Sequence, residues 1–127
     1  MPSRFDTAGH LYILTTLLCT VYGQLVLKWQ MASAGPMPAA LPDKLVFLLK
    51  QLLNPWIVTG FVAAFLASLA WMAAMTRFDL NYAYPFMSLA FIIVMLFSIL
   101  FLGESVTAPR VVGTLLVMAG LVVAARG

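Results

Sequence analysis

Four long runs of apolar residues alternate with short polar segments along the chain, at about residues 11–29, 56–76, 82–102 and 111–125. A helix needs about 20 mainly apolar residues to cross a bilayer. In lipid, the backbone polar groups can be satisfied only within helices or closed barrels. Because the apolar runs are continuous and do not alternate with polar residues, they predict an all-α integral membrane protein with four transmembrane helices.

The connections between these runs differ in length and character. Segments 77–81 and 103–109 are tight links, so the helices that they join are expected to be antiparallel neighbours. The first connection is longer, and its second part, residues 43–54, has two distinct faces on a helical wheel. One face carries Leu45, Leu48, Leu49, Leu52 and Leu53, and the other carries Lys44, Lys50, Gln51 and Asn54. This pattern predicts an amphipathic interfacial helix along the membrane surface, with a water-exposed helical loop as the alternative.

The composition agrees with a membrane protein. Of the 127 residues, 64% are hydrophobic and 9% are charged, whereas an ordinary soluble domain is about 45–50% apolar and about 25% charged. This excludes a soluble enzyme and a disordered chain as first interpretations. The seven Lys and Arg residues are scattered singly, so nucleic-acid binding has no support. We expect residues 1–127 to form a single four-helix domain.

The orientation of the predicted helices is not determined by charge. With four spans, one side of the membrane would carry Arg4, Arg77 and Arg126, and the other would carry Lys28, Lys44, Lys50 and Arg110. The positive-inside rule requires a clear bias between the two sides, and three against four is none. Either a single orientation is hidden in the sequence, or the chain inserts both ways, which would allow antiparallel dimers.

Polar residues recur every four positions along the first run, in a polar stripe formed by Tyr12, Thr16, Thr20, Gln24 and Lys28. Residues four apart lie on one face of a helix. Polar side chains inside a membrane are costly, which makes each a functional candidate. The stripe predicts a cavity or groove, in which these residues bind a substrate. The alternative is interhelical hydrogen bonding, with Lys28 extending only to the lipid head groups.

The third run opens with a second group of candidates. Asn81, Tyr84 and Ser88 lie near one face of the predicted helix, and Tyr82 is close by. Pro85 lacks an N–H, so it frees a carbonyl in the preceding turn and allows the helix to bend. We expect a substrate-binding role for the four polar residues and a gating role for Pro85. For the tyrosines, anchoring at the membrane interface is the alternative.

Small residues predict where helices approach one another. Gly60 belongs to a stripe of small residues in the second run, and Gly113 and Gly120 share a face of the fourth. Glu104 follows the third run and is expected to satisfy the loop backbone or to pair with Arg110. The four acids all lie at the ends of the runs, and no metal-ligand cluster, nucleophile motif or phosphate-binding loop is present. The sequence therefore predicts no enzyme and no cofactor.

Taken together, these features resemble the small multidrug resistance proteins of the drug/metabolite transporter superfamily. The resemblance rests on Gly23 with Lys28, on 82–85 (Tyr-Ala-Tyr-Pro), on Gly103 with Glu104, and on Gly113 with Gly120. Residues 102–107, with the two later glycines, are also similar to the end of an EamA-type repeat. Segments 23–25 (Gly-Gln-Leu) and 83–89 (Ala-Tyr-Pro-Phe-Met-Ser-Leu) look most like the aminoarabinose-phosphoundecaprenol flippase subunits.

The resemblance implies a paired, multi-pass protein of the bacterial inner membrane that translocates a lipid-linked sugar. Gly113 and Gly120 match the glycines through which the drug exporters pair, as a homodimer or heterodimer. The exporters carry a membrane-embedded glutamate where this chain has Thr20, and a proton-coupled cation exporter needs such a carboxylate. Lys28 has no acid in any span to pair with, so we expect it to bind a lipid phosphate, with Arg77 as the next candidate. A small multidrug exporter and a non-transporting accessory subunit are the alternatives.

Overall fold

The computed structural model describes residues 6–126, apart from the side chain of residue 125. Within this range the chain is all-helical, as predicted. Its helices are α1 (Thr7–Ala34), α2 (Leu41–Gln51), α3 (Pro55–Met75), α4 (Leu80–Met87), α5 (Leu89–Phe101) and α6 (Ala108–Arg126). α1, α3 and the continuous segment formed by α4 and α5 are long and apolar enough to cross a membrane, and α6 is a shorter apolar helix.

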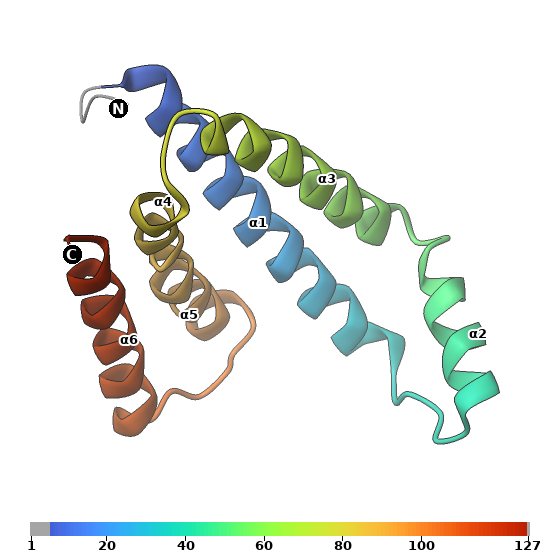
Figure 1. The fold of residues 1–127 in the computed structure, drawn as a ribbon. Helices are drawn as coiled ribbons and strands as arrows, with labels where there is room; N and C mark the ends of the chain where they lie inside the picture. Colours follow the sequence, from blue (N-terminus) through green and yellow to red (C-terminus); the bar gives the residue numbers. More distant parts are fainter. Residues whose placement is uncertain (1–5, 127) are drawn as a thin grey trace.

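The helices form a bundle around α1 (Figure 1). α3 runs back along one side of α1, and this pair has the most extensive contact in the bundle. α4, α5 and α6 lie on the other side, while α2 stands apart next to the start of α3. The start of α1, the end of α3 and the end of α6 therefore lie toward the same end of the bundle.

Two glycines explain why α1 and α3 pack so closely. A Cβ atom added to Gly23 would lie 3.1 Å from the carbonyl oxygen of Gly60, and one added to Gly60 would lie 3.6 Å from that of Gly23. The 3.1 Å distance at Gly23 is tighter than ordinary van der Waals contact, so a larger residue at position 23 would force the two backbones apart. The prediction that Gly60 lies on a close-packing face is confirmed.

The helices begin where the sequence supplies capping groups. Asp6 precedes α1, and its Oδ1 accepts a hydrogen bond from the Gly9 N–H at 3.0 Å. Asn54 precedes α3 and accepts from the Trp56 N–H at 2.9 Å, with Pro55 at the first helical position. Both arrangements satisfy N–H groups that a helix start leaves without partners.

The third apolar run is interrupted, but not where Pro85 was expected to disturb it. The break falls at Ser88, between α4 and α5, and not in the turn before the proline. Here the backbone N–H of Ser88 donates to the Pro85 carbonyl oxygen at 3.1 Å, and the Ser88 hydroxyl donates to the same oxygen. The turn after Pro85 is thus tightened, because its hydrogen bond joins residues three apart and not four apart as in an α-helix. This tightened turn separates two helical segments within one span.

Candidate functional site

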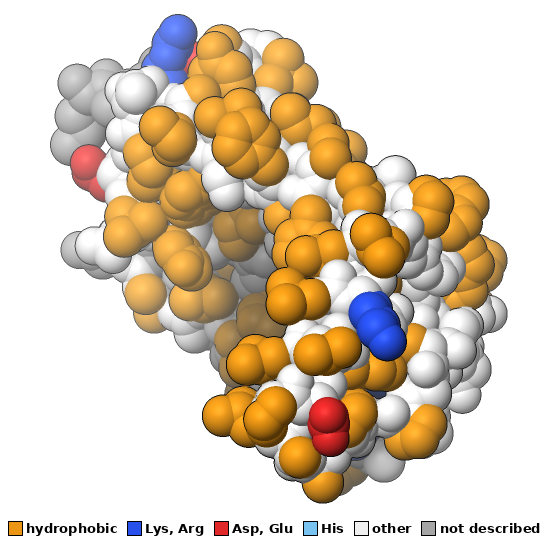
Figure 2. Space-filling view, turned by 90° about the vertical axis from the view of Figure 1, so that its right-hand side faces the viewer, with side chains coloured by type: hydrophobic (Ala, Val, Ile, Leu, Met, Phe, Trp, Pro, Cys, Tyr) orange, Lys and Arg blue, Asp and Glu red, His pale blue; other side chains and the backbone are white. Residues whose placement is uncertain are grey.

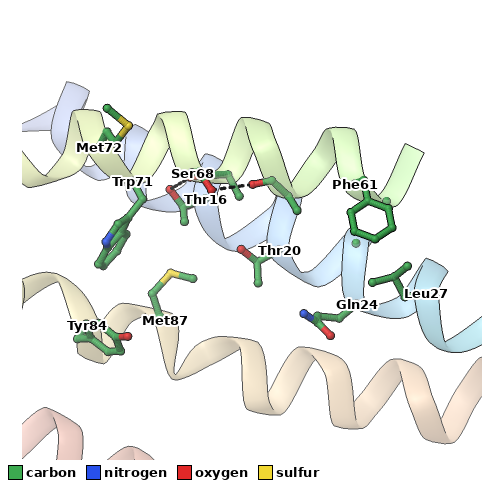
Figure 3. A pocket seen from close by; sticks show the side chains of 14 residues that line it. Thr16, Thr20, Gln24, Leu27, Phe61, Ser68, Trp71, Met72, Tyr84 and Met87 are labelled. Atoms are coloured by element: carbon green, nitrogen blue, oxygen red, sulfur yellow. Dashed lines mark hydrogen bonds between the residues drawn. The ribbon is translucent and has the colours of Figure 1, made fainter. Parts of the chain in front are cut away.

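A groove of about 490 Å³ lies between α1, α3 and α4. Figure 3 shows Thr20 and Gln24 extending into it from α1, opposite Met87 on α4. Ser68 and Trp71 from α3 and Tyr84 from α4 complete its walls. We call it the central groove.

The polar stripe of α1 has two roles. Thr16 is buried, and its hydroxyl bonds the Tyr12 carbonyl oxygen at 2.8 Å and the Ala67 carbonyl oxygen of α3 at 3.5 Å. This is the interhelical bonding that was the alternative to a cavity. Thr16 also lines the central groove, together with Thr20 and Gln24. The groove interpretation therefore describes all three residues, and the bonding interpretation describes Thr16 as well.

The candidates of the third run do not meet at one place. Tyr84 reaches the central groove, where its ring packs edge-to-face on Trp71 with 5.7 Å between ring centroids. Tyr82 and Ser88 line a different groove, between α4, α5 and α6, and Asn81 is exposed and lines neither. The structure therefore does not bring these four candidates together at one groove.

A second groove, of about 700 Å³, lies between α5 and α6. Its polar lining residues are Gln24, Ser98, Glu104, Ser105, Arg110 and Thr114. Gln24 lines both this groove and the central groove, so it lies where the two grooves meet. Gly113 also lines it, and a Cβ added at Gly113 or at Gly120 would have no atom within 4 Å. Both glycines of α6 therefore leave space for contact with a neighbouring helix.

Lys28 lies beyond Gln24 on the polar stripe. The sequence suggested that it has no acidic partner, but in the structure it has one. Its Nζ is 3.4 Å from Oε1 of Glu104, in the link between α5 and α6. Glu104 therefore pairs with Lys28 and not with Arg110, whose Nη1 instead donates to the Ser105 carbonyl oxygen at 3.5 Å. The pair was missed because it joins residues 76 positions apart in the chain, which helical spacing cannot reveal.

At the opposite end of the bundle, Arg77 has a structural partner. Its Nη1 is 3.1 Å from Oδ2 of Asp6, which ties the end of α3 to the start of α1. The hydrogen bond from the Gly9 N–H, and then the Arg77 guanidinium, lower the pKa of Asp6 below its ordinary value of 3.8. Arg77 is therefore engaged in an ion pair, as Lys28 is at the other end of the bundle.

His10 is a residue that sequence reasoning did not select. Its Nδ1 lies 2.7 Å from the Asp6 carbonyl oxygen and its Nε2 lies 3.1 Å from the Tyr82 hydroxyl. Because a carbonyl oxygen can only accept, Nδ1 carries the proton, and in the neutral ring Nε2 accepts from Tyr82. The spacing of four between Asp6 and the only histidine was the available signal. His10 links α1 to α4 at this end.

The described residues hold no group of three or more His, Cys, Asp or Glu side chains that could bind a metal ion. Figure 2 shows that the face at the right of Figure 1 is covered by hydrophobic side chains, with few charges, and is hollowed in the middle. A surface of this kind is suited to lipid rather than to water.

Comparison with known proteins identifies the family. The model of the EamA-like transporter family matches residues 7–126. The chain belongs to this family. The predicted multi-pass protein of the bacterial inner membrane is thereby confirmed, and so is the resemblance inferred from the motifs.

Three curated relatives have closely similar names. A probable 4-amino-4-deoxy-L-arabinose-phosphoundecaprenol flippase subunit ArnF from Aeromonas hydrophila is 31% identical over 124 residues, which is 95% of this chain and 82% of the relative. Probable subunits ArnE of the same flippase are 29% identical in Pseudomonas aeruginosa (90% of this chain, 94% of the relative) and 31% identical in Yersinia pestis (89% and 92%). No solved structure matches the chain.

Proposed function

We propose that the chain is a subunit of a flippase that moves a sugar linked to polyprenyl phosphate across the bacterial inner membrane. The observation that carries this proposal is the central groove, whose polar residues Thr20 and Gln24 lie among apolar walls between membrane-spanning helices. A polar head group could pass along these side chains while its lipid tail stays in the bilayer. The names of the three relatives supply the substrate class.

The absence of a carboxylate from the central groove favours a lipid over a cationic drug. Its lining residues, all within the part of the chain that the structure describes, include no Asp or Glu. A proton-coupled cation exporter needs an ionisable group that exchanges proton and substrate. Thr20 can only donate or accept hydrogen bonds, which suits hydroxyl and phosphate oxygens. The exporter alternative therefore has no supporting observation in the groove.

We assign the lipid phosphate to Lys28. The ammonium lies one turn beyond Gln24, which lines both grooves, so a phosphate held there would place an attached sugar near the Gln24 amide. Because Lys28 already contacts Glu104 at 3.4 Å, the phosphate has to exchange with that carboxylate. Lysine binds phosphate as a compact charge with three donors.

The membrane topology that fits this function has four spans. α6 has 19 residues, which gives a length of about 28 Å at about 1.5 Å per residue. This is close to the thickness of a bilayer core of about 30 Å. α2 then lies along the membrane surface, with the exposed Leu45 and Leu49 in the acyl region and Lys50 toward water.

The functional unit is a dimer, with itself or with a similar small subunit, and α6 forms the seam. One four-helix unit encloses little space, and the faces at Gly113 and Gly120 are open. Replacing both glycines with Leu would keep a partner helix from close approach. In membrane crosslinking we expect the dimer band to disappear in the double variant and to persist in Leu115→Ala; equal dimer bands in both variants would contradict this seam.

Transport in reconstituted vesicles tests the function. A labelled polyprenyl-phosphate sugar on one leaflet should move to the other with the wild-type chain and its partner subunit. Lys28→Ala should stop this movement, and Lys28→Arg should keep part of it because the charge remains. Lys44→Ala removes a charge from α2 and is the matched control, which should transport normally. Transport at the wild-type rate by Lys28→Ala would exclude the phosphate role of Lys28.

A further inference from the structure

The Lys28–Glu104 pair places two opposite charges beside the residue that joins the two grooves. Glu104 is held in position by its backbone, because Gly103 adopts a positive φ of 68° and the Glu104 N–H donates to the Ser98 carbonyl oxygen at 3.0 Å. Its carboxylate lines the α5–α6 groove, and Gln24 lines the same groove from α1. Lys28 does not line this groove, but its Nζ lies 3.4 Å from the Glu104 carboxylate that does, so a head group that reaches Glu104 also comes near a cation.

The contact between the two side chains is weak enough to be exchanged. The Lys28 and Glu104 side chains are 61% and 40% exposed, and the charged atoms are 3.4 Å apart. Exposed ion pairs contribute little to stability, because water competes with each charge. Neither side chain makes another ion pair within the described residues. The pair can therefore open without leaving a buried charge behind.

We propose that Lys28 and Glu104 together recognise a lipid head group that carries both a phosphate and an amine, with the phosphate binding Lys28 and the amine binding Glu104. This inference rests on the proposed function. The names of the three relatives already contain an amino sugar, and what the inference adds is the residue that binds its amine. On binding, Lys28 exchanges the Glu104 carboxylate for the phosphate, and Glu104 exchanges the Lys28 ammonium for the amine. A phosphate lipid with a neutral sugar would instead separate Glu104 from Lys28 and leave the carboxylate without a cation.

Arg110 does not replace Lys28 as the cation for Glu104. It lines the α5–α6 groove, but its guanidinium donates to the Ser105 carbonyl oxygen of its own loop. When a phosphate occupies Lys28, the amine of the substrate is therefore the cation that arrives with it. This arrangement makes Glu104 a specificity residue that distinguishes amino sugars from neutral ones.

A thermodynamic cycle with two ligands and two proteins tests the inference. The ligands are a polyprenyl-phosphate-linked amino sugar and the same lipid with a hydroxyl in place of the amine. Binding is titrated by tryptophan fluorescence, since Trp29 adjoins Lys28, with the full chain and its partner subunit in phosphatidylcholine discs. The wild type should prefer the amine by about fivefold, the fold-change that matches the upper range for an exposed ion pair. Glu104→Gln should lower this preference to near one.

The controls separate this inference from the proposed function. Asp43→Asn removes the same charge from α2 and should keep the wild-type preference. Lys28→Gln should weaken the binding of both ligands. If both ligands bind the wild type equally, or if Glu104→Gln keeps the preference, the assignment of the amine to Glu104 is wrong while the flippase function stands. If neither ligand binds the wild type, the function itself fails.

A bulk phospholipid with the same two charges is the other source of this chemistry. Adding phosphatidylethanolamine to the discs should change the affinity for the amino-sugar lipid by less than twofold if the sugar and polyprenyl chain are also recognised. Strong competition that disappears in Glu104→Gln would show that the bulk lipid is the occupant, which would overturn the assignment to a sugar-linked substrate.

Discussion

The two ends of the helix bundle are held together in different ways. At the end that contains His10, the aromatic ring of Phe78 is buried with Ile13, Ala74 and Ala83. Around this cluster, Asp6 pairs with Arg77 at 3.1 Å and His10 bridges Asp6 to Tyr82. At the end that contains Lys28, a half-exposed ion pair joins α1 to the link between α5 and α6.

This difference indicates which end can move. The His10 end combines buried apolar surface with several hydrogen bonds, so separating its helices would expose the cluster and break the bonds together. At the Lys28 end, the ion pair between α1 and the α5–α6 link can be exchanged for solvent or substrate, while α1 and α3 stay joined by the Asn54–Gln30 hydrogen bond and the Trp29–Trp56 ring contact. The central groove lies between the two ends, with Trp71 and Tyr84 on the His10 side and Gln24 on the Lys28 side (Figure 3). We infer that the His10 end is the fixed point and that the Lys28 end admits the head group.

Locking each end in turn gives the largest expected effect. Cys19→Ser first removes the native cysteine. In one protein, Lys28→Cys and Glu104→Cys are then joined by a short bismaleimide. In a second protein, Asp6→Cys and Arg77→Cys are joined in the same way. Since the Lys28 end has to open, a crosslink there should abolish head-group access to the central groove. A crosslink at the His10 end should leave access intact. Access is measured by acrylamide quenching of the fluorescence of Trp71, which lines the central groove, with Trp29→Phe and Trp56→Phe as the background.

Each locked protein needs its uncrosslinked parent as a control, because both parents lose an ion pair. In the parent of the Lys28 lock, acrylamide should still quench Trp71, which would show that the crosslink and not the substitution closes the groove. Equal quenching of Trp71 in the two locked proteins would remove the distinction between a fixed and a mobile end.

Removing the buried ring of the fixed end should have the next largest effect. Phe78 is 7% exposed, and it packs against the Gly9 backbone so closely that a Cβ there would lie 2.6 Å from its ring. Phe78→Ala should therefore lower the free energy of unfolding by about 3 kcal/mol, through lost burial and the cavity that remains. Phe101→Ala is the control, because Phe101 is 73% exposed. A small and equal loss in both variants, measured by denaturation in detergent, would contradict a packed His10 end.

The sequence predicted the helices better than it predicted their contacts. Continuous apolar runs define where helices form, and the observed bounds differ from the predicted ones by a few residues. α1 extends to Ala34 because no breaker precedes Gly35, whose φ of 88° ends the helix. The position of Thr16, Thr20 and Gln24 along a groove was also predicted, since one helix face is set by local periodicity.

The contacts that the sequence could not supply are long-range ones. Lys28 meets Glu104, and His10 meets Tyr82 72 positions away, only because of how α1 packs against the rest of the bundle. Helical spacing says which residues share a face, but not which face of another helix lies opposite. Asn81, Tyr84 and Ser88 are likewise not brought to one groove, since a shared helical face does not say which neighbouring helix lies opposite it.

The smallest expected effect is the contribution of the Asp6 carboxylate to the fixed end. The Gly9 N–H and the Arg77 guanidinium both favour the charged form, so the pKa of Asp6 is lower in the folded chain than its ordinary value of 3.8. A lowered folded pKa means that the stabilisation is complete above the unfolded pKa and is lost as pH falls through the folded pKa. The wild type should therefore melt slightly above Asp6→Asn near pH 6, and this advantage should disappear as the pH falls below about 4. Asparagine can still cap α1, so the comparison isolates the charge, and the other acids titrate alike in both proteins. Melting curves that stay equally separated at pH 6 and pH 3 would show that the carboxylate charge does not hold α1 to the end of α3.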